Sequence, residues 1–320
     1  MMKIALIVLA YNESNTIEKI ILDNYNLFEK TIVINDKSKD NTREILQKLD
    51  NKYENLIIIN NSKNLGAGKS FEIGLKKFTQ TDCDYALKID GDGQFSIDDI
   101  IKLKEIIQND EYEFIKCDRF WLKGINGKIP IIRYFGNAFA SFLIKFATGN
   151  WKINDALNGL FGISKSLASV FELPRLFNRY GYPFYLNTFV FNFSITNPIK
   201  IGQYKNTITY GEEKSSLNPL TMFFKLIYFV VLNFFKKIKI KIQVSELQIS
   251  SILDMVSLFI FSNLVFSIYK FIGVRYFETP GPQGTWYLLV IIFLILYLSV
   301  LTLSQKQESA FNKSYFSDIG

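Results

Sequence analysis

The sequence of 320 residues contains no histidine, and this absence excludes several kinds of active site. Serine and cysteine nucleophiles are commonly activated by a histidine base, and many zinc sites use histidine ligands. Acid–base chemistry must therefore be carried out by carboxylates, lysine or tyrosine. The chain also has only two cysteines, Cys83 and Cys117. We predict that both are buried free thiols, because few disulfides persist in reducing cytosol.

Acidic residues are fewer than basic ones, 30 against 37, which gives a formal net charge of +7. This charge alone is compatible with nucleic acid, an anionic lipid surface or a phosphorylated substrate. Hydropathy separates these options, because the mixed, charged pattern of the head gives way after Pro219 to long apolar runs. We therefore expect a membrane protein with a soluble head and no nucleic-acid partner. The length allows one large domain with an appendage, or two domains.

The head shows short apolar segments that alternate with amphipathic helical patterns. We expect strands over residues 3–10, 31–35, 56–59, 85–89 and 113–117. Helix starts are expected at Asn15-x-x-Glu18, at Thr42, after Gly68 and near Ser96. This alternation predicts an α/β fold with a mostly parallel sheet covered by helices on both faces. Ligands of such sheets bind beyond the C-terminal strand ends, where residues 11–13, 36 and 90–94 fall.

The segment Asp90-Gly-Asp92-Gly-Gln94 follows the apolar stretch that begins at Tyr85. Its two carboxylates lie at a strand end and repel each other unless a cation or a hydrogen-bonded ligand lies between them. Oxygen donors at this spacing suit a hard divalent ion that keeps open positions for substrate phosphates. The alternative is an acidic surface turn, because Asp-Gly is a favoured turn pair.

The segment Gly66-Ala-Gly68-Lys69-Ser70 raises the alternative of a phosphate-binding P-loop. The full P-loop pattern needs a glycine five residues before Gly68, where this chain has Lys63. We expect instead a loop whose backbone passes close to a nucleotide. A plain helix-entry turn is the other interpretation.

Four motifs occur in the order typical of one enzyme family. They are Ala10-Tyr11-Asn12-Glu13, Asn35-Asp36-Lys37-Ser38-x-Asp40-x-Thr42, Asn64-x-Gly66-x-Gly68 and Asp90-Gly-Asp92-Gly-Gln94. The chain thereby resembles family 2 glycosyltransferases with the GT-A fold. Within them it is most similar to the polyprenyl-phosphate sugar transferases, such as dolichyl-phosphate mannose synthase and its bacterial relatives. The likeness covers roughly the first two-thirds of the chain by motif and the tail by architecture.

The resemblance implies a nucleotide site and a metal ion. The residues that would form the nucleotide site are Ala10, Tyr11, Asn12, Glu13, Asp36, Asn64, Gly66, Gly68, Lys69, Asp90 and Gly91. Asp36 would bond the base or ribose, and Asp90 would lie on the ribose side. Asp92 and Gln94, with Asp90, would complete the ligand set for Mg²⁺ or Mn²⁺ on the donor diphosphate. That ion would act as a Lewis acid on the leaving nucleoside diphosphate. This chain departs from the family pattern at Asn35, because the family usually has an acidic residue there as well as at the position of Asp36.

The candidate catalytic residues are Asp92, Arg119, Arg133 and Asp155. Arg119 matches a family arginine that faces the phosphates, although Cys117-Asp118 replace the small pair usually found before it. Arg133 opens a helical pattern and could hold an acceptor phosphate bidentately. Asp155 lies in a segment similar to the family's Asp-x-x-x-Gly. It would be the general base for a hydroxyl acceptor, whereas an ionised lipid phosphate needs none. Its other interpretation is a loop-positioning residue.

Two further segments are basic or polar. Lys123 and Lys128 lie in an irregular loop that either closes over an anionic acceptor or is simply solvated. Residues 210–217 resemble a family segment near the end of the head, but the arginine expected before the serines is missing. Lys214 is the candidate to replace its contact with an acceptor phosphate.

The tail is apolar from Leu220 to Phe235 and basic from Lys236 to Lys241. This pattern predicts an interfacial helix on an anionic leaflet, with a third span as the alternative. Residues 252–272 and 286–303 are long enough to cross a ~30 Å hydrocarbon core. Lysines before the first span, with Lys306 and Lys313 after the second, place both ends in the cytoplasm. Asp254, near the edge of the first span, is expected to reach lipid headgroups.

The chain is therefore expected to have three parts. Residues 1–218 form the cytoplasmic GT-A head, residues 219–245 the interfacial segment, and residues 246–320 a two-span hairpin with a short cytoplasmic tail. The predicted enzyme is an inverting hexosyltransferase that moves a sugar from a nucleotide-diphosphate sugar to a polyprenyl phosphate, in cell-envelope glycan synthesis. The inversion is implied by the resemblance.

Two alternatives remain open. The acceptor could be a hydroxyl of a lipid-linked glycan or a cell-surface polysaccharide. The protein could also be a non-catalytic membrane scaffold with a degenerate head, although the intact Asp90, Asp92 and Gln94 argue against this. A homo-oligomer is compatible with the sequence.

Overall fold

The computed structural model describes residues 2–109, 112–120, 125–126, 131–209, 219–244, 249–277, 281–311 and 316–319. Contacts divide the chain into two compact units. The first, here named the sheet unit, comprises Met1–Thr148, Lys152–Val230 and Ser314–Gly320. The second, the hairpin unit, comprises Gly149–Trp151 and Val231–Lys313.

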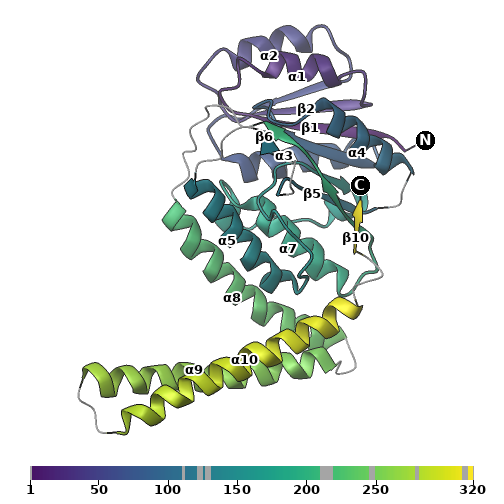
Figure 1. The fold of residues 1–320 in the computed structure, drawn as a ribbon. Helices are drawn as coiled ribbons and strands as arrows, with labels where there is room; N and C mark the ends of the chain where they lie inside the picture. The colour runs from purple at the N-terminus through teal and green to yellow at the C-terminus, as the bar shows by residue number, and fades with distance from the viewer. Residues whose placement is uncertain are drawn as a thin grey trace. The chain divides into compact units, whose positions relative to one another are not determined.

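The sheet unit contains an eight-stranded sheet with the strand order β10-β8-β5-β7-β4-β1-β2-β3. Figure 1 shows the fold as a ribbon. Its strands are β1 (Ile4–Ala10), β2 (Lys30–Asn35), β3 (Leu56–Asn60), β4 (Tyr85–Asp90), β5 (Phe114–Asp118), β7 (Phe161–Ser164), β8 (Ile201–Lys205) and β10 (Phe316–Ile319). Strand β7 runs antiparallel to β4 and β5, and the other pairs in this sheet are parallel. A separate small pair joins β6 (Ile125–Asn126) to β9 (Ile208–Thr209). The predicted mostly parallel α/β sheet is thus confirmed.

Helices connect these strands and continue into the tail. They are α1 (Ile17–Asn24), α2 (Thr42–Asp50), α3 (Ala67–Thr79), α4 (Ile97–Asn109), α5 (Ile131–Thr148), α6 (Lys165–Ser169), α7 (Tyr182–Ser194), α8 (Pro219–Val244), α9 (Ile249–Tyr276) and α10 (Gln283–Phe311), with a 3₁₀ turn η1 (Arg175–Phe177).

Helices cover both faces of the sheet because alternate residues of a strand point to opposite sides. In β1, Leu6 and Val8 belong to one buried cluster, which also contains residues of α1, α2 and α4. Ile7 and Leu9 belong to the other, with residues of α3, α5 and α7. A strand buried on both faces reads as a continuous apolar run, which is why β1 was recognisable in the sequence.

The start of α1 differs from the prediction. The helix begins at Ile17 behind Thr16, and Asn15 does not cap it. The Thr16 hydroxyl also makes no capping bond to the helix amides. It donates instead to the carbonyl oxygen of Gly91, at 2.6 Å. The helix therefore begins one residue later than predicted, and Thr16 links this loop to the turn after β4.

The first part of α8 packs into the core of the sheet unit. Met222 and Leu226 are buried there, and the ring of Phe229 lies 5.0 Å from that of Phe177. Lys225 donates to the carbonyl oxygen of Tyr180 at 2.9 Å. Among the described helices, two are long and apolar enough to span a membrane, and α8 is not one of them. The alternative of a third span is therefore not supported.

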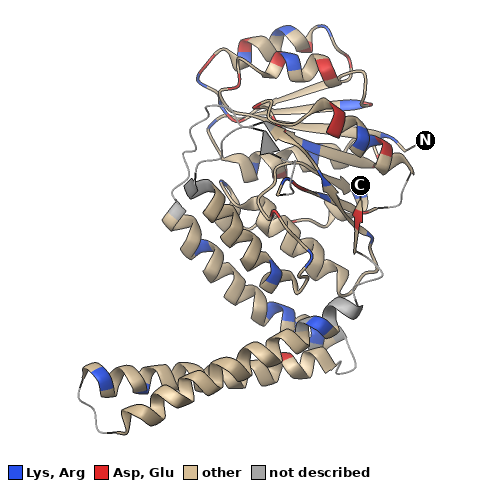
Figure 2. Ribbon diagram, viewed as in Figure 1, with Lys and Arg blue, Asp and Glu red and all other residues tan. Residues whose placement is uncertain are grey.

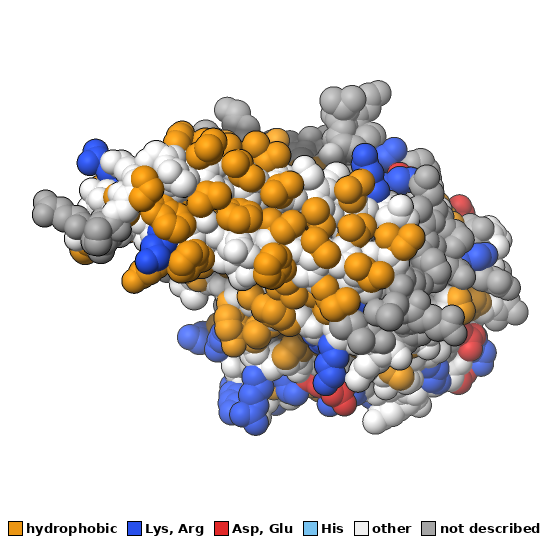
Figure 3. Space-filling view, turned by 90° about the horizontal axis from the view of Figure 1, so that it is seen from below, with side chains coloured by type: hydrophobic (Ala, Val, Ile, Leu, Met, Phe, Trp, Pro, Cys, Tyr) orange, Lys and Arg blue, Asp and Glu red, His pale blue; other side chains and the backbone are white. Residues whose placement is uncertain are grey.

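Those two helices, α9 and α10, form an antiparallel hairpin. The ring of Phe261 lies 5.2 Å from that of Tyr297, and the Ser304 hydroxyl donates to the carbonyl oxygen of Ser250 at 3.1 Å. Few charged residues occur along them (Figure 2), and many of their large hydrophobic side chains are exposed. Figure 3 shows such side chains spread over one face of the molecule. This composition and length agree with the two predicted membrane spans.

Asp254, which was predicted to reach lipid headgroups, is not exposed. It is buried in the hairpin unit, where its Oδ2 lies 2.8 Å from the Lys241 Nζ and its Oδ1 accepts from the Ser304 hydroxyl. An isolated buried charge would be costly, so the carboxylate is retained with a cation and a hydroxyl as partners.

The end of the chain forms β10, which the sequence analysis did not predict. Its register against β8 pairs Phe316 with Ile201, and the Gln203 Nε2 donates to Asp318 Oδ1 at 2.9 Å. The chain up to Val230 and from Ser314 onward, on either side of the main segment of the hairpin unit, therefore belongs to the sheet unit.

Candidate functional site

The C-terminal ends of β1, β2 and β4 lie side by side. Their register pairs Ala10 with Asn35 and Leu9 with Asp90. Parallel neighbours bring their following loops to one edge of the sheet, so the motifs recognised in the sequence meet there.

The loops after β1 and β2 are held together by hydrogen bonds. The Asn12 N–H donates to Ser38 Oγ at 3.0 Å, and the Glu13 N–H donates to Thr42 Oγ1 at 2.9 Å. Asn12 has a φ of 60°, a left-handed conformation that asparagine tolerates better than most residues. The ring of Tyr11 is exposed beside these fixed loops. The loop predicted to line a nucleotide site is thus pre-formed.

Asp36 is buried and holds the loop between β3 and α3. Its Oδ1 accepts from Asn61 Nδ2 and from the Leu65 N–H, both at 2.8 Å. Its Oδ2 accepts from the Gly66 N–H at 2.7 Å, and Asn64 Nδ2 lies 3.4 Å from its carbonyl oxygen. In this structure the carboxylate positions a loop, in addition to the nucleotide contact that the resemblance implies.

The glycine loop packs against protein. The N–H groups of Gly68 and Lys69 donate to the carbonyl oxygens of Arg179 (3.1 Å) and Asn178 (2.7 Å). A Cβ added at Gly68 would collide with the carbonyl oxygen of Phe177. A P-loop needs such amides for phosphate, so the P-loop interpretation is wrong. The close approach of this backbone to a nucleotide stays a prediction, and the close approach that the structure shows is to residues 177–179.

Replacing Gly68 by alanine is therefore expected to lower the free energy of unfolding by about 3 kcal/mol. The added methyl group cannot fit against Phe177 without moving backbone. Gly136→Ala is the matched control, because no described atom lies within 4 Å of the added Cβ. Alanine in a helix should stabilise by up to about 1 kcal/mol. Denaturant unfolding of the full chain in detergent measures both variants, and equal stabilities would contradict the packing role.

The turn after β4 carries two oxygen-bearing side chains, those of Asp92 and Gln94. The Gly91 N–H donates to the Leu9 carbonyl oxygen at 2.8 Å, which fixes the turn against β1. Gly93 has a φ of 75°, which glycine adopts without strain. Asp92 Oδ1 accepts from the Gln94 N–H at 3.1 Å, and both side chains are half-buried.

Asp92 and Gln94 fit a hard divalent ion by the chemistry of their donors. A carboxylate oxygen and an amide oxygen are ligands that Mg²⁺ and Mn²⁺ accept. No group of three or more His, Cys, Asp or Glu in the described part of the chain is arranged to hold a metal ion alone. A cation here would need further oxygens, which a donor diphosphate carries.

Asp90 is paired with a lysine that the sequence analysis missed. Lys88 is fully buried in β4, and its Nζ lies 2.5 Å from Asp90 Oδ1. Burial, followed by the charge of Asp90, raises the pKa of the nearby Tyr182 hydroxyl well above its usual value. The signal available in the sequence was a lysine within an otherwise apolar strand.

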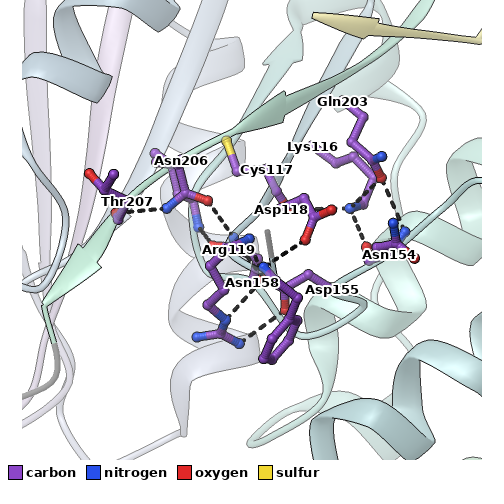
Figure 4. Close-up of polar contacts among 12 residues, drawn as sticks. Lys116, Cys117, Asp118, Arg119, Asn154, Asp155, Asn158, Gln203, Asn206 and Thr207 are labelled. Atoms are coloured by element: carbon purple, nitrogen blue, oxygen red, sulfur yellow. Dashed lines mark hydrogen bonds and ion pairs between the residues drawn. The ribbon is translucent and has the colours of Figure 1, made fainter. Parts of the chain in front are cut away.

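Arg119 and Asp155 form a buried ion pair (Figure 4). The Arg119 Nε lies 2.9 Å from Asp155 Oδ2, and its Nη2 donates to Oδ1 at 3.1 Å. The Arg119 N–H and Asn158 Nδ2 also donate to Oδ2, at 3.1 and 3.0 Å. Asp155 has a φ of 46°, a strained conformation of the kind found at functional sites. Its carboxylate orients Arg119, which agrees with the loop-positioning interpretation.

A second polar cluster fixes the residue before Asp155. Lys116 donates to the carbonyl oxygen of Asn154 and, at 3.2 Å, to Gln203 Oε1 (Figure 4). Gln203 Oε1 also accepts from the Asn154 N–H at 3.1 Å. Burial lowers the pKa of Lys116. These contacts make the Asp155 loop part of the rigid sheet edge.

Some predicted residues are not brought into this site. Lys69 pairs with Glu72 along the surface of α3. Arg133 lies in α5, but its side chain is outside the described residues, as are Lys123, Lys128 and the segment 210–217 with Lys214. Asn61 and Asn158 were missed, because an amide in a loop has no distinctive pattern in the sequence.

Comparisons with known proteins agree with this geometry. The sequence profile described as "Glycosyl transferase family 2" matches residues 5–171. A UDP-N-acetylglucosamine–dolichyl-phosphate N-acetylglucosaminyltransferase of Methanococcus voltae is 32% identical over 191 residues, which cover 55% of this chain and 75% of that protein. A dolichyl-phosphate beta-glucosyltransferase of Trichomonas vaginalis is 26% identical over 117 residues, 33% of this chain and 35% of that protein.

The fold is also shared with a solved structure. Glucosyl-3-phosphoglycerate synthase from Mycobacterium tuberculosis, in complex with Mn²⁺, UDP and glucosyl-3-phosphoglycerate, aligns with a TM-score of 0.51 and 15% identity. The alignment covers 74% of this chain and 80% of that one. The similarity supports a GT-A-like fold. The profile match and the Methanococcus voltae relative show that the chain belongs to glycosyl transferase family 2 and is a glycosyltransferase.

Proposed function

We propose that this protein transfers a sugar, with inversion, from a UDP-sugar to a polyprenyl phosphate at the cytoplasmic face of a membrane. The curated relatives from Methanococcus voltae and Trichomonas vaginalis are named as dolichyl-phosphate sugar transferases, which supports this acceptor class. A UDP donor is supported by the name of the former and by the UDP in the glucosyl-3-phosphoglycerate synthase complex.

The donor would bind at the edge formed by β1, β2 and β4. The exposed ring of Tyr11 is suited to stacking on a base, and the fixed Asn12–Glu13 backbone would hold the ribose side. Asp36 would add a hydrogen bond to the base or ribose while it holds the loop at Gly66. A carboxylate oxygen can accept more than one hydrogen bond, so the two roles are compatible.

Asp92 and Gln94 would hold a Mg²⁺ or Mn²⁺ ion at this edge. The bound ion supplies Lewis-acid neutralisation of the diphosphate as it leaves. Arg119, directly after β5 in the same sheet, would add positive charge for the donor or acceptor phosphates, and Arg133 is proposed as a second acceptor contact. Arginine suits this work because its planar group binds phosphate bidentately.

The contacts of Asp155 are the observation that favours a phosphate acceptor over a hydroxyl acceptor. A hydroxyl acceptor needs a general base, and Asp155 was its candidate. Its carboxylate is fully buried and receives the hydrogen bonds of Arg119 and Asn158. A carboxylate engaged in this way is poorly placed to take a proton from a substrate. A phosphate acceptor is already ionised and attacks the anomeric carbon without a base.

The membrane arrangement is proposed as two spans, α9 and α10, with the catalytic head and both termini in the cytoplasm. The chain up to Val230 and the chain from Ser314 both belong to the sheet unit, which supports an even number of crossings between them. The basic residues from Lys236 to Lys241 would lie at an anionic leaflet. The head over residues 1–218, the interfacial segment over 219–245 and the hairpin over 246–320 are thus proposed as functional parts.

The test is an assay of membranes that contain the full chain, with labelled UDP-sugars and with or without polyprenyl phosphate. We expect a labelled lipid product that requires polyprenyl phosphate and a divalent ion. Release of the sugar by mild acid identifies the phosphodiester, because a sugar linked through phosphate is acid-labile. Label that enters an acid-stable glycan independently of added polyprenyl phosphate would instead identify a hydroxyl acceptor.

A further inference from the structure

We propose that Lys88 is a positioning residue that keeps Asp90 from acting as a metal ligand. Asp92 and Gln94 then hold the divalent ion, and Asp90 faces hydroxyl groups of the donor. The inference rests on the proposed metal-dependent sugar transfer and divides the work of the two acidic residues in the turn after β4.

The first observation is the burial of Lys88. It lies in the middle of β4, in register with Ile7 of β1 and Phe161 of β7. Its Nζ lies 5.4 Å from the ring centroid of Tyr182 and 5.8 Å from that of Phe161. A fully buried ammonium group is costly unless a counter-charge accompanies it. Asp90 supplies that charge, because residues two apart in a strand point to the same face.

The second observation is the confinement of Asp90. Lys88 Nζ lies 2.5 Å from Oδ1 of its carboxylate. On the other side, a Cβ added at Gly159 would collide with Oδ2 and would lie 3.3 Å from Lys88 Nζ. The carboxylate therefore occupies a slot between a lysine and a glycine backbone, and turning toward a metal ion would leave the buried lysine without its partner.

The pairing has an electrostatic consequence. Lys88 and Asp90 together add no net charge to the site, whereas an unpaired Asp90 would add one negative charge beside Asp92. The site is therefore adapted to a cation that arrives with a diphosphate rather than to one bound alone. Removing the positive charge of Lys88 should raise the affinity for a free divalent ion, the opposite of what damage to the fold would cause.

The experiment measures Mn²⁺ binding to the nucleotide-free full chain in detergent, by electron paramagnetic resonance. Lys88→Met is expected to bind Mn²⁺ about tenfold more tightly than the wild type, since a charge near the site is lost. The double variant Lys88→Met/Asp90→Asn replaces an ion pair, whose net charge is zero, by two uncharged side chains. It should return to within about twofold of the wild-type affinity.

If Lys88→Met alone does not fold, the double variant still tests whether Asp90 is a metal ligand, because the double variant has no unpaired buried charge. Binding more than about tenfold weaker than wild type in the double variant would identify Asp90 as a ligand and overturn the proposal. Unchanged Mn²⁺ affinity in folded Lys88→Met would overturn it as well. Lys104→Met is the control for loss of one positive charge. Lys104 lies on α4, where its Nζ contacts the ring of Phe28 and not Asp90.

A wild-type measurement with UDP separates this proposal from the proposed function. If the wild type binds no Mn²⁺ even with UDP, the metal-dependent transfer itself fails. If it binds with UDP and Lys88→Met behaves like the wild type in both conditions, only the role of Lys88 fails.

Discussion

Asp92→Ala is expected to reduce sugar transfer by about a thousandfold, equivalent to roughly 4 kcal/mol of transition-state stabilisation. Asp92 is half-buried at the exit of β4, and its proposed role is to hold the ion that neutralises the leaving diphosphate. Its Oδ1 also accepts from the Gln94 N–H, so the loss of this side chain affects both proposed ligands. Initial rates with a labelled UDP-sugar measure the effect, and Mn²⁺ binding in the presence of UDP should be lost in parallel.

Asp98→Asn provides the matched control. Asp98 is an exposed carboxylate in the first turn of α4, close to the same turn in the sequence. Its removal changes the net charge by the same amount but should leave the rate within about twofold, as most surface substitutions do. Transfer that persists in Asp92→Ala, or an equal loss in both variants, would contradict the metal assignment.

The part of the fold predicted from the sequence is the part with strong local patterns. Strands β1, β2, β3, β4 and β5 are short apolar runs bounded by polar loops, and buried parallel strands are expected to look like this. Strand β7 contains only Phe161–Ser164, and β10 only Phe316–Ile319. Both owe their existence to neighbours far away in the chain, since a four-residue segment has too little pattern to specify an edge or an antiparallel insertion.

In the candidate site, too, the positions of the motif residues were predictable from the sequence, and their individual contacts were not. From the motif order we predicted that Asp90, Asp92 and Gln94 lie at the C-terminal end of a strand, and the structure places them at the end of β4 and in the turn after it. The roles of individual residues depended on partners that the order does not reveal. The ion pair of Asp155 with Arg119 is not visible in the sequence, and the lysine within the apolar strand β4 is visible there but its contact with Asp90 is not. Buried polar groups need partners, but only the folded chain determines which ones.

The glycine loop shows that a motif can be recognised while one reason for its glycines stays hidden in the sequence. Gly66 and Gly68 were expected to let the backbone approach a nucleotide. In the structure, a side chain at either position would collide with residues 177–179. Both explanations require glycine, so the residue type alone cannot separate them.

Asp155→Asn is expected to lower the free energy of unfolding by about 3–5 kcal/mol, because removing one partner of a buried ion pair leaves the other charge uncompensated. Both side chains are well buried, with relative exposures of 11% for Arg119 and 0% for Asp155. Asparagine tolerates the φ of 46° at this position, so the backbone should be preserved. Denaturant unfolding of the full chain measures the loss.

The double variant Arg119→Met/Asp155→Asn tests whether the cost comes from the unpaired arginine. With both charges removed, most of the lost stability should return, since a buried pair is often replaceable by neutral groups of similar size. Transfer should nevertheless stay low, because the proposed phosphate contact of Arg119 is then gone. If Asp155 were a general base, the single variant would lose transfer to a hydroxyl acceptor without a matching loss of stability. Stability and transfer that recovered together in the double variant would show that Arg119 only supports the fold.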